Sequence, residues 1–72
     1  MNENAPAVLR ETADVLWRVK IIAAYLGLRE KAAQHRIDKG EIPTFRIGNT
    51  ICSRRSLLDA WLDDKERSVK NG

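Results

Sequence analysis

Apolar residues recur every three or four positions in one early stretch of the chain, as they do on one face of an α-helix. The residues that share this face are Val19, Ile22, Ala23 and Leu26. Gly27 follows them, at the position where a left-handed residue commonly ends a helix. The pattern therefore predicts a helix that stops at Gly27.

A second helical stretch begins two residues after Gly27, in the run REKAAQHRIDKG. Ala33 and Ile37 lie about one turn apart in it and define its apolar face, with Leu28 just ahead of them. Gly40 marks its end. Two helices joined by a short turn that contains a glycine are typical of a helix-turn-helix.

The pattern then changes from helical spacing to alternation. Phe45 and Ile47 alternate with polar residues, which predicts a strand whose two apolar side chains face the core. Pro43 has no backbone N–H and suits the first position of this strand. Gly48 and Asn49 can both take the positive φ angles of a tight turn, so we expect a β-hairpin here.

Helical spacing also occurs toward both ends of the chain. In the last apolar stretch, SLLDAWLDDKER, Ser56 and Asp59 have the spacing of a capping box at the start of a helix. Near the beginning, a weaker apolar stripe after Pro6 predicts a further helix over residues 6–15. The expected organisation is an N-terminal extension over residues 1–17, a domain over 18–62 and a polar tail over 63–72.

Composition narrows the class of protein. With 72 residues the chain can build one small core, which leaves no room for an enzyme cleft. No apolar run approaches the roughly 18 residues that a membrane span needs, and the first residues lack the pattern of a signal peptide. A single cysteine, Cys52, favours a reducing cytoplasm. The one histidine, His35, has no partner at the spacing of a metal or catalytic site, so we expect no enzyme activity and no cofactor.

Charge is distributed unevenly along the chain. Residues 18–56 carry nine basic and three acidic side chains, a net charge of +6, whereas residues 1–17 and 57–72 carry −2 and −1. A basic middle between acidic ends indicates a surface for a polyanion. The alternative is a solvated surface of mixed charge.

The motifs GEIP, FRIG and DAWL follow YLG at set distances. With them, the run over residues 18–62 resembles the small winged helix-turn-helix domain of phage excisionases and their AlpA-type relatives, which are similar to the DNA-binding head of MerR regulators. The chain differs from this family at the start of the second helix, where Arg29, Glu30 and Lys31 replace small hydroxyl residues. It also differs at the hairpin tip, where Asn49 and Thr50 stand in place of two arginines.

The expected fold is mainly α, a winged helix-turn-helix with a two-stranded β-hairpin wing and an extra N-terminal helix. In the family, the second helix lies in the major groove of duplex DNA. Helix geometry makes the outward residues of its N-terminal half candidates for base contacts, namely Lys31, Gln34 and His35. Candidates for contacts with the DNA backbone flank this helix or lie on the wing, namely Arg18, Arg29, Arg36, Arg46, Asn49, Thr50 and Arg54.

The resemblance implies a sequence-specific protein for double-stranded DNA, acting in the bacterial cytoplasm at the nucleoid. It favours an excisionase-like factor that bends DNA for a tyrosine integrase and sets the direction of recombination. A small transcriptional regulator of a phage or mobile element is the alternative. A protein–protein interaction module without DNA binding is an alternative of another class. One small domain makes few phosphate contacts, so we expect a homodimer or cooperative assembly on DNA, with residues 6–17 as a candidate contact surface. The alternative is that residues 6–17 cover the small core of their own domain.

Overall fold

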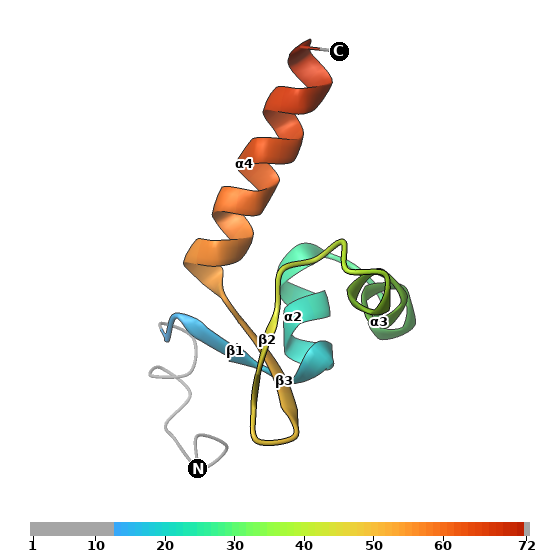
Figure 1. Cartoon of the computed structure of the whole chain (residues 1–72), viewed down its shortest axis with the longest axis vertical. Helices are drawn as coiled ribbons and strands as arrows, with labels where there is room; N and C mark the ends of the chain where they lie inside the picture. Colours follow the sequence, from blue (N-terminus) through green and yellow to red (C-terminus); the bar gives the residue numbers. More distant parts are fainter. Residues whose placement is uncertain (1–12, 72) are drawn as a thin grey trace.

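The computed structural model describes residues 13–71, in which helices predominate and a small antiparallel sheet joins them (Figure 1). The elements in chain order are β1 (Val15–Trp17), α2 (Arg18–Leu26), α3 (Glu30–Asp38), β2 (Phe45–Ile47), β3 (Thr50–Arg54) and α4 (Arg55–Asn71). The sheet has the strand order β1-β3-β2, and both strand pairs are antiparallel. The first strand therefore lies beside the last one, although about 40 residues separate them in the chain.

The two predicted helices around the short turn are confirmed as α2 and α3. Gly27 follows α2 with a φ of 74°, and its N–H closes the last helical turn. This left-handed conformation strains any residue that has a Cβ atom, which explains why glycine stands here. Arg29 is extended and precedes α3, and Gly40 follows the last turn of α3 at a φ of 76°.

The described chain begins with a strand that the sequence did not predict. The predicted helix over residues 6–15 lies outside the described residues except for its last three, and Val15 there belongs to β1. Leu16 is buried between two half-buried neighbours, which is the period of a strand. Leu16 fits the apolar spacing of a helix as well as that of a strand. The apolar pattern after Pro6 therefore wrongly predicted a helix at this point. The folded domain thus includes residues 15–17, which the sequence assigned to an extension.

The predicted hairpin is present as β2 and β3, joined by a tight turn at Gly48 and Asn49. Of these two residues, only Gly48 has a positive φ, 62°, as expected for the first central residue of a type II′ turn. Pro43 does not start the strand, because β2 begins two residues later at Phe45. The carbonyl oxygen of Pro43 instead accepts a hydrogen bond of 2.9 Å from the hydroxyl of Ser53 in β3.

The apolar side chains of β2 do not face the core, contrary to the prediction. Phe45 is 36% exposed and Ile47 is 45% exposed. Phe45 pairs with Cys52 and Arg46 pairs with Ile51, and directly paired residues share a face of the sheet. Ile51 packs against the helices, so Arg46 lies on the helix side and Phe45 on the opposite side. The alternation was correctly recognised but assigned to the wrong faces.

Two small clusters form the core. One joins the sheet, α2 and α4, and consists of Leu16, Ile22, Ile42 and Leu58. The other joins α2 to α3 and consists of Val19, Ala23 and Ala33. Leu28 and Ile37 pack against the second cluster, as predicted. The position of α3 on the domain therefore depends on the contact of Ala33 with two small side chains of α2.

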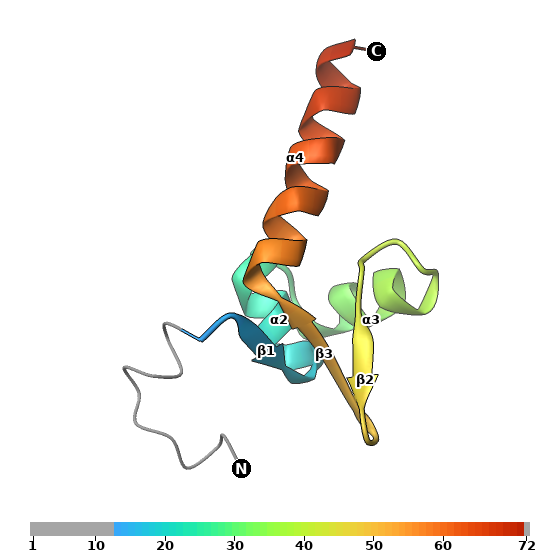
Figure 2. The same ribbon diagram turned by 60° about the vertical axis from the view of Figure 1, so that its left-hand side comes forward.

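α4 continues directly from β3 and projects away from the rest of the domain (Figures 1 and 2). Its 17 residues reach Asn71, so the segment over 63–71 is helical rather than a polar tail. Opposite charges four residues apart, at Asp63 and Arg67, favour this continuation. None of the helices within residues 13–71 is both long and apolar enough to cross a membrane.

The first turn of α4 is capped from the segment before β1. The carboxylate of Asp14 accepts hydrogen bonds of 3.0 Å from both the backbone N–H and the hydroxyl of Ser56, and one of 2.6 Å from Nε of Arg54. The backbone N–H of Arg55 donates to the carbonyl oxygen of Asp14 at 2.7 Å. These donors, the backbone N–H of Ser56 first among them, lower the pKa of Asp14 from its ordinary value.

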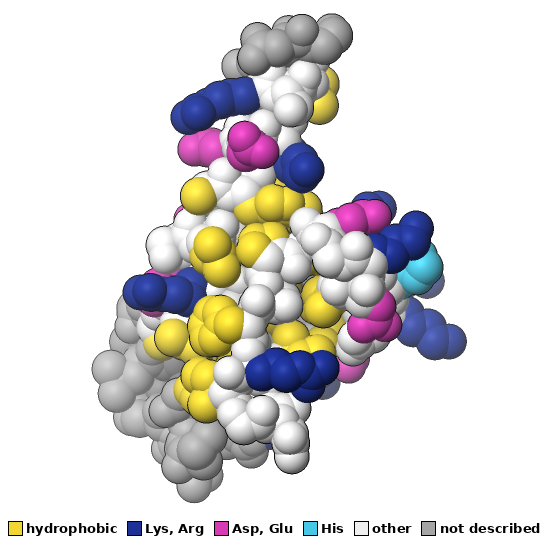
Figure 3. All heavy atoms as spheres, in the orientation of Figure 1, with side chains coloured by type: hydrophobic (Ala, Val, Ile, Leu, Met, Phe, Trp, Pro, Cys, Tyr) yellow, Lys and Arg dark blue, Asp and Glu magenta, His cyan; other side chains and the backbone are white. Residues whose placement is uncertain are grey.

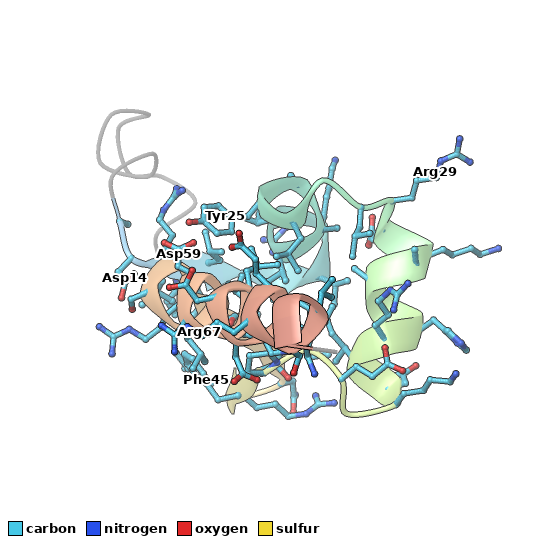
Figure 4. The ribbon with its side chains drawn as sticks, turned by 90° about the horizontal axis from the view of Figure 1, so that it is seen from above. Asp14, Tyr25, Arg29, Phe45, Asp59 and Arg67 are labelled. Atoms are coloured by element: carbon cyan, nitrogen blue, oxygen red, sulfur yellow. The ribbon has the colours of Figure 1, made fainter. Side chains whose placement is uncertain are left out.

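The predicted capping box does not form, because Ser56 and Asp59 both bond to other elements. The hydroxyl of Tyr25 in α2 donates to the carboxylate of Asp59 at 2.6 Å, and this bond raises the pKa of Tyr25. The guanidinium of Arg55 lies over the Tyr25 ring, 5.2 Å from its centre. Figure 4 shows Asp14, Tyr25 and Asp59 together on the side of the domain away from α3.

Candidate nucleic-acid interface

α3 packs on its own domain through one side and exposes the other. Ala33 is fully buried against α2, and Ile37 is half-buried beside it. Lys31 and His35 are exposed. Figure 3 shows basic side chains and the histidine along the outer side of α3, with acidic side chains among them. Two of the three predicted base-contact candidates therefore stand where a ligand could reach them.

Gln34, the third candidate, is half-buried and already has a partner. Its Nε2 donates a hydrogen bond of 2.8 Å to a carboxylate oxygen of Asp38, one turn further along α3. This bond orients the amide and leaves its carbonyl oxygen and one N–H for another group. A bidentate contact with adenine uses one carbonyl oxygen and one N–H of the amide, so the bond to Asp38 leaves Gln34 the groups that such a contact requires.

Arg29 and Arg36 flank the outer face of α3. Arg29 precedes the first turn and extends away from the domain in Figure 4. Nη1 of Arg36 lies 3.1 Å from a carboxylate oxygen of Glu41, just beyond the end of α3, and both side chains are largely exposed. Exposed ion pairs of this kind contribute little free energy. A phosphate group could therefore replace Glu41 as the partner of Arg36.

A shallow groove of about 310 Å³ separates α3 from the tip of the hairpin. Four predicted contact residues from three parts of the chain line it, and Glu30 adds a negative charge. Its lining residues are Arg18, Val19, Glu30, Gln34, Asn49, Thr50 and Ile51. The fold thus brings one predicted base-contact residue together with three predicted backbone-contact residues.

Arg18 occupies a strained position at this groove. Within residues 13–71 it is the one non-glycine residue with a positive φ, 78°. β1 passes into α2 at Arg18 without a connecting loop. A side chain in this region costs on the order of 1–2 kcal/mol, and such strain is concentrated at functional sites. The junction fixes where the Arg18 side chain leaves the backbone, at the edge of the groove.

The two remaining arginines lie on opposite faces of the sheet. Arg46 shares the face of Ile51, which is the side that carries α2 and α3. Arg54 pairs with Val15 in the sheet and is held by Asp14 at 2.6 Å. The fold therefore places Arg46 on the side of α3 and leaves Arg54 in the cap of α4.

Other chemistry is limited in the described part of the chain. Residues 13–71 contain no group of three or more His, Cys, Asp or Glu side chains that could hold a metal ion. Cys52 is fully buried in β3, and its thiol lies 3.6 Å from the carbonyl oxygen of Thr50.

Comparison with known proteins identifies no relative of this chain. The chain matches no protein-family model, no curated protein and no solved structure. What the surface can bind follows from its residues and their placement.

Sequence reasoning missed the acidic partners of three candidate residues. Asp38 and Glu41 lie four and five positions after Gln34 and Arg36, so helical spacing could have indicated the first of these pairs. Asp14 lies 40 residues before Arg54, and its role depends on the pairing of β1 with β3. Local spacing carries no signal for a contact of this range.

Proposed function

We propose that this chain is a small winged helix-turn-helix protein that binds double-stranded DNA, with α3 in the major groove and the hairpin beside it. The observation that carries the proposal is the groove between α3 and the hairpin tip, which gathers Arg18, Gln34, Asn49 and Thr50. The exposed Lys31 adds a positive charge on α3. A major groove about 12 Å wide admits one helix, and α3 is covered by its own domain along one side only.

The proposed contacts divide into two kinds. Lys31, Gln34 and His35 would approach base edges, because they lie on the outward side of α3 and two of them belong to its N-terminal half. The residues proposed to contact phosphates are Arg18, Arg29, Arg36, Arg46, Asn49 and Thr50. Arg54 is left out of this surface, because it is held by Asp14 on the other face of the sheet.

The resemblance to excisionases favours a role in recombination, in which the protein bends DNA for a tyrosine integrase. A transcriptional regulator of a phage or mobile element would use the same surface. An excision reaction with purified integrase and its attachment sites separates the two roles. Stimulation of excision supports the recombination role, whereas repression of a promoter without any effect on excision supports the regulator.

A gel-shift titration at two salt concentrations tests DNA binding itself. Displacement of counterions by basic side chains makes affinity fall steeply with salt, so we expect binding at about 50 mM salt that weakens at least tenfold at about 200 mM. If no duplex is bound at the lower salt concentration, the alternative hypothesis of a protein–protein interaction module is favoured.

Glu30 supplies a test of where the DNA lies. Glu30→Gln removes a negative charge from the groove, so we expect about a two- to fivefold gain in affinity at low salt. Asp63→Asn is the matched control, since it removes the same charge from an exposed position on α4. Equal gains in both variants would mean that total charge, rather than this groove, governs binding.

A further inference from the structure

Positive φ angles within residues 13–71 occur at three glycines and at one other residue, Arg18. The glycines follow α2, follow α3 and form the turn of the hairpin, at Gly27, Gly40 and Gly48. Glycine has no Cβ atom and takes this conformation without steric cost, whereas Arg18 at a φ of 78° is strained. The described chain therefore keeps a side chain at the one position where its own pattern would place a further glycine.

The short connection between β1 and α2 explains the backbone conformation of Arg18 but not the arginine itself. Trp17 ends β1 and Arg18 begins α2, so the chain changes direction within one residue. Glycine would make this change with less strain. A positive charge is also unfavourable at the start of a helix, where the N–H groups carry partial positive charge, and the first turn of α2 contains no acidic residue. Neither the backbone nor the helix dipole therefore favours arginine here.

The side chain of Arg18 lies at the groove between α3 and the hairpin tip. Among the described residues that line this groove, Arg18 is the one cation and Glu30 is the one anion. Without Arg18 the lining would carry a net negative charge and would repel DNA. Asn49 and Thr50 line the groove from the hairpin, and their side chains can donate hydrogen bonds to a phosphate oxygen. The donors around the groove therefore suit one phosphate of a DNA strand.

We propose that Arg18 holds one DNA phosphate in this groove, and that the domain has a lower stability because it keeps a strained arginine for this contact. A guanidinium can donate two parallel hydrogen bonds to one phosphate, which fixes the DNA strand between α3 and the hairpin. This inference rests on the proposed DNA binding, and it adds that the strain at Arg18 serves that binding. Replacement of Arg18 by glycine should therefore raise stability and lower affinity.

Two variants that both lack the arginine side chain measure the strain. At an ordinary helical position alanine is more stabilising than glycine. A positive φ reverses this order, so Arg18→Gly should unfold at a Tm about 3–8 °C above that of Arg18→Ala. Lys20→Gly and Lys20→Ala, at an exposed position of α2, should show the ordinary order. Thermal unfolding followed by circular dichroism compares the four variants, and the ordinary order at Arg18 would overturn the proposal.

The same variants are then titrated with a duplex that the unmodified protein selects from a randomised pool. Arg18→Gly and Arg18→Ala should both bind about tenfold or more weakly, with a salt dependence reduced by about one ion, because both lose the phosphate contact. Lys20→Ala removes the same charge from α2 outside the groove and should change the affinity far less. Because Arg18→Gly is the more stable of the two, its weak binding cannot result from unfolding.

Arg18→Lys separates the charge from the geometry of the contact. Lysine keeps the positive charge but cannot donate two parallel hydrogen bonds, so this variant should keep the salt dependence of the unmodified protein and lose part of the affinity. Full affinity in Arg18→Gly would overturn the inference and leave DNA binding itself intact. If the unmodified protein bound no duplex at low salt, the proposed function would fail, so the two failures are distinguishable.

Discussion

At the scale of single residues, Gln34 represents the proposed base contacts and Arg46 represents the proposed phosphate contacts. Gln34 lines the groove from α3, so Gln34→Ala should relax sequence preference at one base position by about 1–3 kcal/mol. Arg46 lies on β2, so Arg46→Ala should weaken all sequences alike and reduce the salt dependence by about one ion. Selection from randomised duplexes, followed by titrations at several salt concentrations, measures both effects. A uniform loss in both variants would refute this division.

Asp14 makes a residue-scale prediction about stability and its pH dependence. Because its pKa is lowered in the folded protein, the ionised carboxylate stabilises the fold at pH values above the unfolded pKa of about 3.9. This stabilisation is lost as pH falls through the lower, folded pKa. Asp14→Asn should therefore lower the Tm at pH 7, and the difference from the unmodified protein should shrink below about pH 4.

Thermal unfolding followed by circular dichroism at several pH values measures this difference. Asp63→Asn changes the same group at an exposed position on α4 and serves as the control. A Tm difference for Asp14→Asn that stays constant down to pH 2 would mean that the ionised carboxylate is not the source of the stabilisation.

At the scale of elements, the sequence predicted those parts that local patterns determine. The spacing of apolar residues and Gly27 indicated α2 and its end, and alternation before Gly48 indicated the hairpin. β1 was missed because three residues form a strand only through pairing with β3. The faces of β2 were misassigned for a related reason. Alternation shows that successive side chains lie on opposite faces of the strand, but only packing determines which face is toward the helices.

The candidate site was predictable to a similar extent. Periodicity placed Lys31 and His35 on the exposed side of α3, because helix geometry requires only one buried reference such as Ala33. The groove between α3 and the hairpin tip was not predictable, since it arises where α2, α3 and β3 meet. The ion pair of Arg54 with Asp14 was not predictable either, because it also depends on contacts between distant parts of the chain.

The hairpin makes a prediction at the element scale. Its tip carries Asn49, which is exposed, where the resembled family has arginine. Asn49→Arg should raise DNA affinity and increase the salt dependence by about one ion, because it adds one phosphate contact. Ala60→Arg adds the same charge on α4 and should leave the salt dependence unchanged. A gain shared by both variants would argue against contact between the hairpin tip and DNA.

At the scale of the whole molecule, a small core makes each buried side chain important. Leu58 is fully buried and joins α4 to the sheet and α2, whereas its neighbour Leu57 is 37% exposed. Leu58→Ala should cost about 2–5 kcal/mol of unfolding free energy, a large fraction of the roughly 5–15 kcal/mol by which domains are stable. Leu57→Ala should cost clearly less. Urea unfolding of both variants measures the difference, and similar costs would contradict the placement of α4.

Because Cys52 is completely buried, the reaction rate of its thiol depends on how often the domain opens. The sequence contains one cysteine, and its side chain in β3 has no exposed surface. A thiol reagent can therefore react only in molecules whose sheet has opened, so the rate of alkylation measures how often the domain opens. A ligand that binds the closed form slows that rate in proportion to its occupancy. The unmodified chain can thus report the binding of DNA, or of another partner that binds the closed form, without an added label.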